Sequence, residues 1–191
     1  MSSHTYSGRD DTELIRLWQY DPDTAVSRIF EVYFEEVCHH IYRIIPDTAI
    51  CHDIAQSIFM ELWQKRRSFS IRTSVGAYLH RMARSRSLNY IRDNKHFVTD
   101  NEAAIREMAD SQSTPLDTVM EAELNTVITE AINRLPERCR LVFALSRFEG
   151  MSYKEIAEAL EISVKTVENQ MSKALQQLRL ALEIYHRGNH P

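Results

Sequence analysis

The stretch from Gly150 to Gln170 limits the possible folds most, because it encodes two helices separated by only a few residues. Ser152, followed three residues later by Glu155, forms a capping box in which each side chain satisfies a free backbone donor. Ser163 is a suitable N-cap for the second helix. So short a connection forces the two helices to cross steeply, and we therefore predict a helix-turn-helix.

The second of these helices carries different chemistry on its two sides. At about 100° per residue, one side is apolar and is expected to pack inward: Val164, Val167, Met171, Ala174, Leu175 and Leu178. Amides and hydroxyls suit base edges in a major groove, and lysines suit phosphates. The candidate duplex contacts are Lys165, Thr166, Asn169, Ser172 and Lys173. An ordinary solvated polar face is the alternative, but the turn and the capping box favour DNA binding.

The composition is that of an all-α globular chain. Of its 191 residues 43% are hydrophobic and only four are glycine, and apolar positions recur with a period near 3.6. No apolar run approaches the roughly 20 residues of a membrane span, and the N-terminus does not resemble a signal peptide, so we expect a cytoplasmic protein. The three cysteines are expected to be buried, reduced thiols. His39 and His40 lack partners at ligand spacing, so no metal and no cofactor are expected.

Charge is segregated along the chain although the net charge is only −4. Residues 64–99 contain nine basic residues and one acidic residue, whereas residues 1–63 and 100–133 are each strongly acidic. The basic stretch is therefore a candidate nucleic-acid surface.

Helix signals organise the chain into two small helical domains. We predict helices from about residue 11, from 22 to 45, from 47 to 65, from 74 to 93, from 117 to 134 and from 136 to 148, before the helix-turn-helix. The predicted organisation is a disordered N-terminus (1–10), a first domain (11–94), an acidic linker (95–116) and a second domain (117–187).

The helix predicted for residues 47–65 has a mixed outer face. Its inward face comprises Ile54, Ile58, Phe59, Leu62 and Trp63, whereas Asp53, Gln56, Met60 and Gln64 lie together on the other side. An exposed methionine among polar residues suits an adaptable protein contact. A plain solvated face is an equally good interpretation from this pattern alone.

The basic stretch combines cations with aromatic rings. The loop of residues 65–73 is followed by a helix in which Arg81, Arg84 and Arg92 cluster opposite Val75, Leu79 and Met82. Arginine binds phosphates and aromatic rings stack on unpaired bases, so the combination suits single-stranded DNA. The alternative is that aromatic residues such as Tyr90 belong to the core.

Three segments resemble regions of the proteins of one family, and they follow one another in the same order as in that family. Residues 53–63 (DIAQSIFMELW) resemble the polymerase-binding helix of sigma region 2, and residues 77–92 (AYLHRMARSRSLNYIR) resemble the promoter-melting helix that follows it. Residues 135–179 resemble sigma region 4. The chain is thus similar, from about residue 11 onward, to the extracytoplasmic-function sigma factors of bacteria.

This resemblance implies a transcription initiation factor without enzymatic activity or small-molecule substrate. Core RNA polymerase would be bound by Asp53, Gln56, Met60 and Gln64. The −10 promoter DNA would be melted and held by Lys65, Arg66, Arg67, Phe69, Arg72, Arg81, Arg84, Ser85 and Arg92. The −35 element would be read by Lys165, Thr166, Asn169, Ser172 and Lys173. The acidic linker would occupy the path later taken by RNA, and an anti-sigma factor, often membrane-bound in this family, would be an inhibitory partner.

Two residues depart from the family pattern. Glu161 occupies the turn where glycine is usual, which would cost about 1 kcal/mol if its φ is positive. Ser85 stands where asparagine is common, which weakens its assignment as a base contact.

Two other classes of function compete with the sigma interpretation. A stand-alone helix-turn-helix regulator would use the same C-terminal helices but would have no use for residues 50–92. An enzyme has little support, because the sequence has no catalytic triad pattern, phosphate-binding glycine loop or metal cluster.

Overall fold

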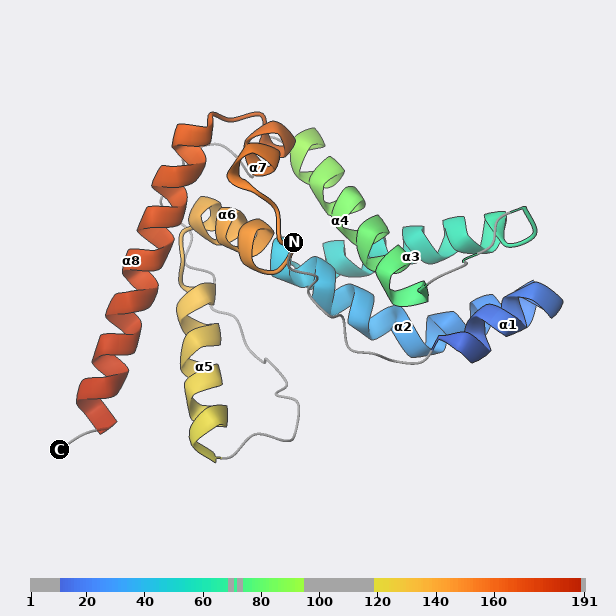
Figure 1. The fold of residues 1–191 in the computed structure, drawn as a ribbon, viewed down its shortest axis with the longest axis horizontal. Helices are drawn as coiled ribbons and strands as arrows, with labels where there is room; N and C mark the ends of the chain where they lie inside the picture. The colour runs from blue at the N-terminus through green and yellow to red at the C-terminus, as the bar shows by residue number, and fades with distance from the viewer. Residues whose placement is uncertain (1–10, 69–70, 72–73, 95–118, 190–191) are drawn as a thin grey trace. The chain divides into compact units, whose positions relative to one another are not determined.

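The computed structural model describes residues 11–68, 71, 74–94 and 119–189 of the chain. These described residues form helices and no strand, so the predicted all-α class is confirmed (Figure 1). The helices are α1 (Thr12–Tyr20), α2 (Pro22–Ile44), α3 (Thr48–Lys65), α4 (Val75–Asp93), α5 (Val119–Asn133), α6 (Glu137–Arg147), α7 (Tyr153–Leu160) and α8 (Val164–Asn189).

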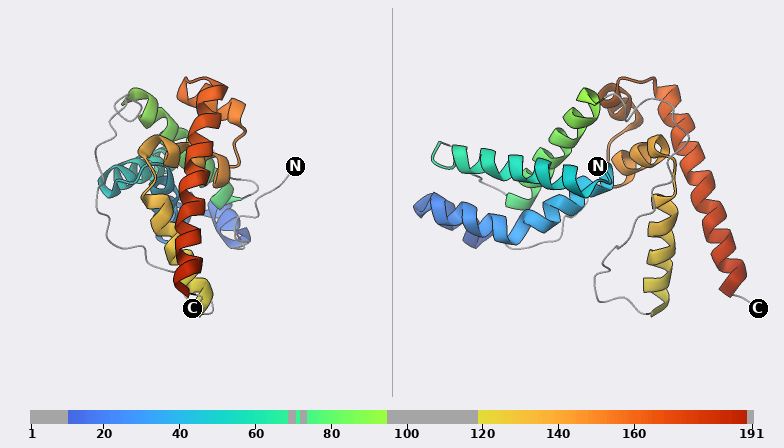
Figure 2. Two further views of the ribbon diagram at one scale, coloured as in Figure 1. Left: turned by 90° about the vertical axis from the view of Figure 1, so that its left-hand side faces the viewer. Right: turned by 180° about the vertical axis from the view of Figure 1, so that it is seen from behind.

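The chain divides into two compact units, at residues 1–93 and 94–191. In the first unit α2 contacts α1, α3 and α4, and is therefore the helix around which the unit is assembled (Figures 1 and 2). Its core consists of aliphatic residues that are excluded from solvent, among them Ile29, Ile41, Ile58, Leu62, Leu79 and Ile91. Burial of such side chains stabilises the unit by roughly 1.5–3 kcal/mol each.

Side-chain caps fix where the helices of the first unit begin. The Asp21 carboxylate accepts a hydrogen bond from the backbone N–H of Thr24 at 3.2 Å, and Pro22 is the first residue of α2. Asp47 caps α3 by accepting from the N–H of Ile50 at 3.1 Å. Each cap satisfies a backbone donor that has no partner inside the helix. The helix starts predicted at these two aspartates are confirmed.

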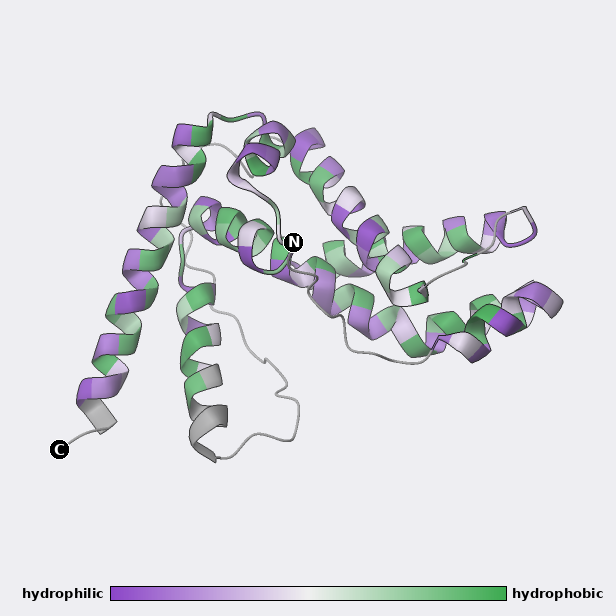
Figure 3. Ribbon diagram, viewed as in Figure 1, coloured by the Kyte–Doolittle hydropathy of each residue, from purple (hydrophilic) through white to green (hydrophobic). Residues whose placement is uncertain are grey.

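In the second unit α8 contacts α5, α6 and α7 (Figure 1). The inward side of α8 is fully or almost fully buried at Val167, Met171 and Ala174, and Leu145 and Ile156 are buried on α6 and α7. Hydrophobic and hydrophilic residues alternate along α8 (Figure 3), as expected for a helix that packs on one side only.

The predicted helix-turn-helix is present. Ser152 Oγ accepts from the N–H of Glu155 at 3.3 Å, and Glu155 Oε2 accepts from the N–H of Ser152 at 2.8 Å, which completes the capping box of α7. Ser163 Oγ accepts from the N–H of Thr166 at 3.0 Å and caps α8. Only residues 161–163 separate α7 from α8.

Glu161, in this turn, has a left-handed backbone with φ of 55° and ψ of 40°. Residues other than glycine are strained there, by roughly 1–2 kcal/mol. Glu161→Gly should therefore raise the free energy of unfolding of the second unit by about 1 kcal/mol. Chemical denaturation of the full chain, followed by circular dichroism, measures this change.

Glu158→Gly is the matched control, because Glu158 is exposed and lies within α7. Glycine inside a helix costs about 1 kcal/mol, so this variant should be less stable. If both glycine variants shift stability in the same direction, backbone strain at residue 161 is not the cause.

Three apolar residues that were predicted to pack inward are exposed instead. Trp63 is 44% exposed, Val164 is 41% exposed and Leu175 is 40% exposed. A helical repeat gives the side on which a residue lies, but not how far the neighbouring helices extend over that side. Val164 is the first residue of α8, where helix–helix packing is incomplete. The prediction for Trp63 was wrong for another reason, because the helical repeat places Trp63 beside the exposed Gln56.

No helix in the described part of the chain combines the length and the apolar character that a membrane crossing requires. The predicted disordered N-terminus (1–10), Phe69, Arg72 and the predicted linker (95–116) lie outside the described residues.

Candidate nucleic-acid and protein interfaces

The outer face of α3 presents the four residues predicted to contact a protein partner. Asp53, Gln56, Met60 and Gln64 are all exposed, and 62% of Met60 is accessible. Ile54, Ile58 and Leu62 on the opposite side are buried, so this orientation is fixed by the core. We call these four exposed residues the α3 ridge.

Aromatic residues that the sequence analysis did not select lie beside the α3 ridge. Trp63 lies within about 20° of Gln56 around the axis of α3 and extends the exposed face. Phe59 packs against Phe30 of α2 with ring centroids 5.1 Å apart, and Phe30 is itself 42% exposed. The α3 ridge therefore has apolar as well as polar surface, a combination suited to a protein partner.

At the C-terminal end of α3 the predicted DNA-binding cations are paired with carboxylates. Lys65 Nζ bonds Glu61 Oε1, and Arg66 and Arg67 both bond Asp23 at the start of α2. The side chain of Arg66 is 19% exposed and that of Arg67 is 74% exposed. The hydrogen bonds from Arg66 and then from Arg67 lower the pKa of Asp23, which keeps the carboxylate ionised at neutral pH.

Helix α4 presents arginines on its outer side. Arg81 and Arg92 are exposed, Arg84 is half-buried and Ser85 is exposed, so none of these side chains lies in the core. The guanidinium of Arg81 lies 5.9 Å from the centroid of the Tyr78 ring, within cation–π range. The first unit therefore carries exposed cations both at the C-terminal end of α3 and along α4, and we call these residues together the cationic surface.

Arg86 is a further cation on α4 that the sequence analysis left out. Its guanidinium bonds Glu61 of α3, and its side chain is 43% exposed. The hydrogen bonds from Lys65 and then from Arg86 lower the pKa of Glu61. Glu61 thus links the two helices that carry the predicted polymerase and DNA contacts.

Asp11 fixes where α4 begins. It is only 7% exposed, and its carboxylate accepts hydrogen bonds from the Tyr33 hydroxyl, from the N–H of Val75 at 2.7 Å and from Ser74 Oγ at 3.2 Å. Sequence reasoning placed Asp11 only at the start of the first helix. Its partners are 22 to 64 residues away in the chain, so no local pattern could have identified this role.

A histidine pair lies between α2 and α4. His80 Nε2 is 3.0 Å from Glu36 Oε1, and the His80 ring packs against that of His40 with centroids 4.5 Å apart and the ring planes tilted by 39°. Both rings are buried. Among the residues that the structure describes, no group of three or more histidine, cysteine or acidic side chains is arranged to hold a metal ion.

The cysteines are buried and free, as predicted. Burial raises the pKa of Cys38 to about 11 and that of Cys51 to about 12, so both are protonated thiols at neutral pH. Cys139 donates a hydrogen bond to Gln170 Oε1 at 3.0 Å and thereby connects α6 to α8.

The outer face of α8 has the chemistry of a recognition helix. Lys165, Asn169, Ser172 and Lys173 are exposed, and Thr166 is half-buried. Lys165 pairs with Glu168 at 3.1 Å, and the Thr166 hydroxyl shares a 2.9 Å hydrogen bond with Ser163 Oγ. Thr166 therefore contributes to the helix cap, while Asn169, Ser172 and Lys173 extend away from the core.

Two family profiles match this chain. The profile for sigma-70 region 2 matches residues 29–97, and the profile for sigma-70 region 4 matches residues 126–178. The first match contains the α3 ridge and α4, and the second contains α6, α7 and the outer face of α8.

Whole-chain relatives agree with these profiles. The ECF RNA polymerase sigma factor SigW of Bacillus subtilis is 29% identical over 166 residues, which cover 83% of this chain and 89% of SigW. The RNA polymerase sigma-H factor of Pseudomonas aeruginosa is 25% identical and covers 91% of this chain and 94% of the relative.

A solved sigma factor, RpoE of Bartonella quintana in complex with the anti-sigma factor NepR, is 17% identical with a TM-score of 0.47. The match covers 83% of this chain and 96% of the RpoE chain. The region 2 and region 4 profiles match in that order along the chain, and the relatives span most of its length. The chain therefore belongs to the extracytoplasmic-function group of the sigma-70 family, the transcription initiation factors of bacterial RNA polymerase.

Proposed function

We propose that three surfaces divide the work of initiation: the α3 ridge binds core RNA polymerase, the basic end of α3 with α4 holds melted −10 DNA, and the outer face of α8 reads the −35 element. The observation that carries the proposal is the exposure of the α3 ridge next to a cationic surface in the same unit. A plain DNA-binding module would need no such ridge.

In this proposal the first domain spans residues 11–94, the linker 95–116 and the second domain 117–187. The −10 contacts are Lys65, Arg66, Arg67, Phe69, Arg72, Arg81, Arg84, Ser85 and Arg92. The protein acts in the cytoplasm by binding alone, without catalytic chemistry of its own. Family membership also supports an anti-sigma factor as an inhibitor.

A binding experiment separates this function from that of a stand-alone regulator. Purified chain is mixed with core polymerase and with duplex promoter fragments, each alone and together. We expect a complex with core polymerase, and promoter binding that requires it. Tight, sequence-specific binding to duplex DNA by the chain alone would favour the regulator.

Asn169→Ala tests the assignment of α8. The amide of Asn169 is exposed and can bond a base edge in two places, so its loss should cost about 1–3 kcal/mol at one position of the −35 element and relax specificity there. Promoter selection from a library randomised over the −35 element, transcribed by the holoenzyme, measures this effect.

Lys173→Ala is the matched comparison on the same face. A phosphate contact carries no sequence information, so this variant should weaken binding about equally for all sequences. If both variants select the same promoters as the unchanged protein with equal affinity, α8 does not read the −35 element in the way proposed.

A further inference from the structure

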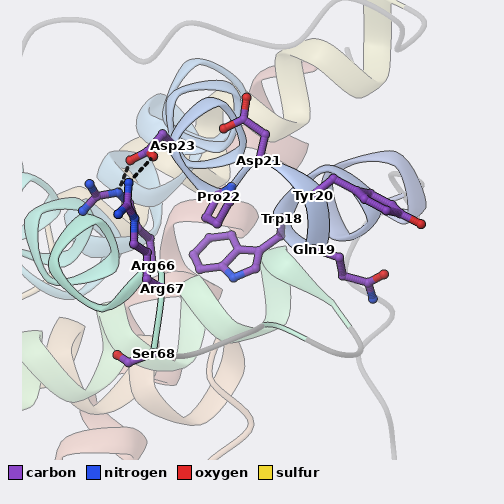
Figure 4. A pocket seen from close by; sticks show the side chains of 9 residues that line it. All are labelled: Trp18, Gln19, Tyr20, Asp21, Pro22, Asp23, Arg66, Arg67 and Ser68. Atoms are coloured by element: carbon purple, nitrogen blue, oxygen red, sulfur yellow. Dashed lines mark hydrogen bonds and ion pairs between the residues drawn. The ribbon is translucent and has the colours of Figure 1, made fainter.

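An open cleft of about 570 Å³ lies in the first unit, where the end of α1 meets the end of α3 (Figure 4). It is lined by two segments, residues 18–23 and residues 66–68. Within it the Asp23 carboxylate faces Arg66 and Arg67, and an interaction is drawn from each arginine to this one carboxylate (Figure 4). Asp21 lines the same cleft but accepts its hydrogen bonds from Thr24.

The two arginines are held to different degrees. Arg66 bonds Asp23 through Nε, donates from Nη1 to the backbone carbonyl of Trp63 at 2.7 Å, and lies over the Trp63 ring at 3.9 Å. Arg67 bonds Asp23 through Nη2 at 3.0 Å, and 74% of its side chain is exposed. Arg66 is therefore anchored by three contacts, whereas Arg67 can leave Asp23 without losing other packing.

We propose that Asp23 acts as an internal competitor of the DNA backbone, pairing with Arg67 and Arg66 in the free factor and so weakening its hold on single-stranded DNA. Asp23 thus acts through the two arginines and does not itself contact DNA. The inference rests on the proposed function, in which both arginines contact melted −10 DNA.

The competition follows from the chemistry of the two acceptors. A carboxylate and a phosphate both accept a charge-assisted bond from the planar guanidinium of arginine. Arg67 must give up Asp23 before a phosphate can take the same N–H groups, and Asp23, then paired with Arg66 alone, repels the phosphate more strongly. The ion pair between Arg67 and Asp23 is exposed and adds little to folding. The fold therefore loses almost no stability when this pair opens.

Asp23→Asn in the full chain tests the proposal, with Asp21→Asn as the matched control. Both changes remove one negative charge from the same cleft, but only the first releases the arginines. The probe is a fluorescein-labelled oligothymidine, and its affinity is measured by anisotropy over a range of salt concentrations, with the chain alone and bound to core polymerase. Thermal unfolding of each variant is recorded as a check on the fold.

We expect Asp23→Asn to bind the oligonucleotide about two- to fivefold more tightly at low salt than the unchanged chain. The slope of log affinity against log salt should steepen by about 0.7, because one more arginine displaces a counterion. Neither change is expected in Asp21→Asn, and the gain should disappear when Asp23→Asn is combined with Arg67→Ala. A merely structural role of Asp23 would not alter the salt slope.

An equal gain in both asparagine variants, or none in Asp23→Asn, would overturn the inference. Weaker binding by Asp23→Asn would overturn it too, since Asp23 would then orient the arginines productively. Failure of the proposed function looks different: Arg67→Ala and Arg81→Ala, made singly in the unchanged chain, would then leave oligonucleotide binding intact in the polymerase complex.

Discussion

Replacing Asp53 and Gln56 together by alanine is expected to weaken capture of core RNA polymerase at least tenfold. Both side chains are exposed on the α3 ridge and contribute nothing to the core, so the free energy of unfolding should change by less than about 0.5 kcal/mol. A tenfold loss corresponds to about 1.4 kcal/mol, which the truncation of a single interface hot spot exceeds. Titration of labelled core polymerase with each variant measures the capture.

The control for this pair is Arg28→Ala with Glu31→Ala, which removes an exposed ion pair from α2 without changing the net charge. It should leave polymerase capture unchanged. Met60→Ala added to the double variant should weaken capture further, because Met60 supplies the apolar part of the α3 ridge. Capture that is normal in all of these variants would remove the α3 ridge from the polymerase interface.

Asp11→Ala is expected to lower the stability of the first unit by about 2–4 kcal/mol. The substitution leaves the Tyr33 hydroxyl and the N–H of Val75 without their acceptor, in positions that water reaches poorly. Each buried polar group that loses its partner costs about 1–3 kcal/mol. Urea denaturation of the full chain, monitored by helix content, measures the loss.

Asp21→Ala is the comparison for this variant, because it removes an exposed helix cap and should cost only about 1 kcal/mol. The larger effect of Asp11→Ala should be accompanied by weaker promoter opening, since Asp11 holds the start of α4. A stability within about 0.5 kcal/mol of the unchanged chain would mean that Asp11 does not hold α4 in place.

The parts of the fold that the sequence predicted are those written in local patterns. Ser152 and Glu155 are three residues apart, and so are Asp21 and Thr24; such pairs depend on helix geometry alone. Periodicity likewise predicted the exposure of Met60, because its neighbours at helical spacing, Gln56 and Gln64, are polar and exposed. Local spacing thus determined where the helices begin and which side of α3 faces outward.

The ion pairs between distant segments could not be predicted. Arg66 and Arg67 lie 43 and 44 residues from Asp23, and Arg86 lies 25 residues from Glu61. Nothing in the sequence near these cations shows that they are already paired in the free protein. Their pairing depends on how α2, α3 and α4 pack, which no single helix pattern contains.

Packing also decided which apolar residues are exposed. Trp63 was assigned to the inward face, but the helical repeat places it beside the exposed Gln56; the guanidinium of Arg66 lies over its ring and 44% of the residue stays accessible. Leu175 follows the pattern of α8, which extends beyond the reach of α7. Helix periodicity gives the direction of a side chain, whereas burial also requires a neighbour at that point.

Transcription in vitro from a library of random DNA fragments tests the central claim most directly. Core polymerase is incubated with the full chain, with the double variant of Asp53 and Gln56, or without either, and the 5′ ends of the transcripts are mapped. The account predicts that only the unchanged chain directs initiation at a shared set of sites with common sequences near −35 and −10. Transcripts that start at the same sites with core polymerase alone, or with the double variant as efficiently as with the unchanged chain, would contradict it.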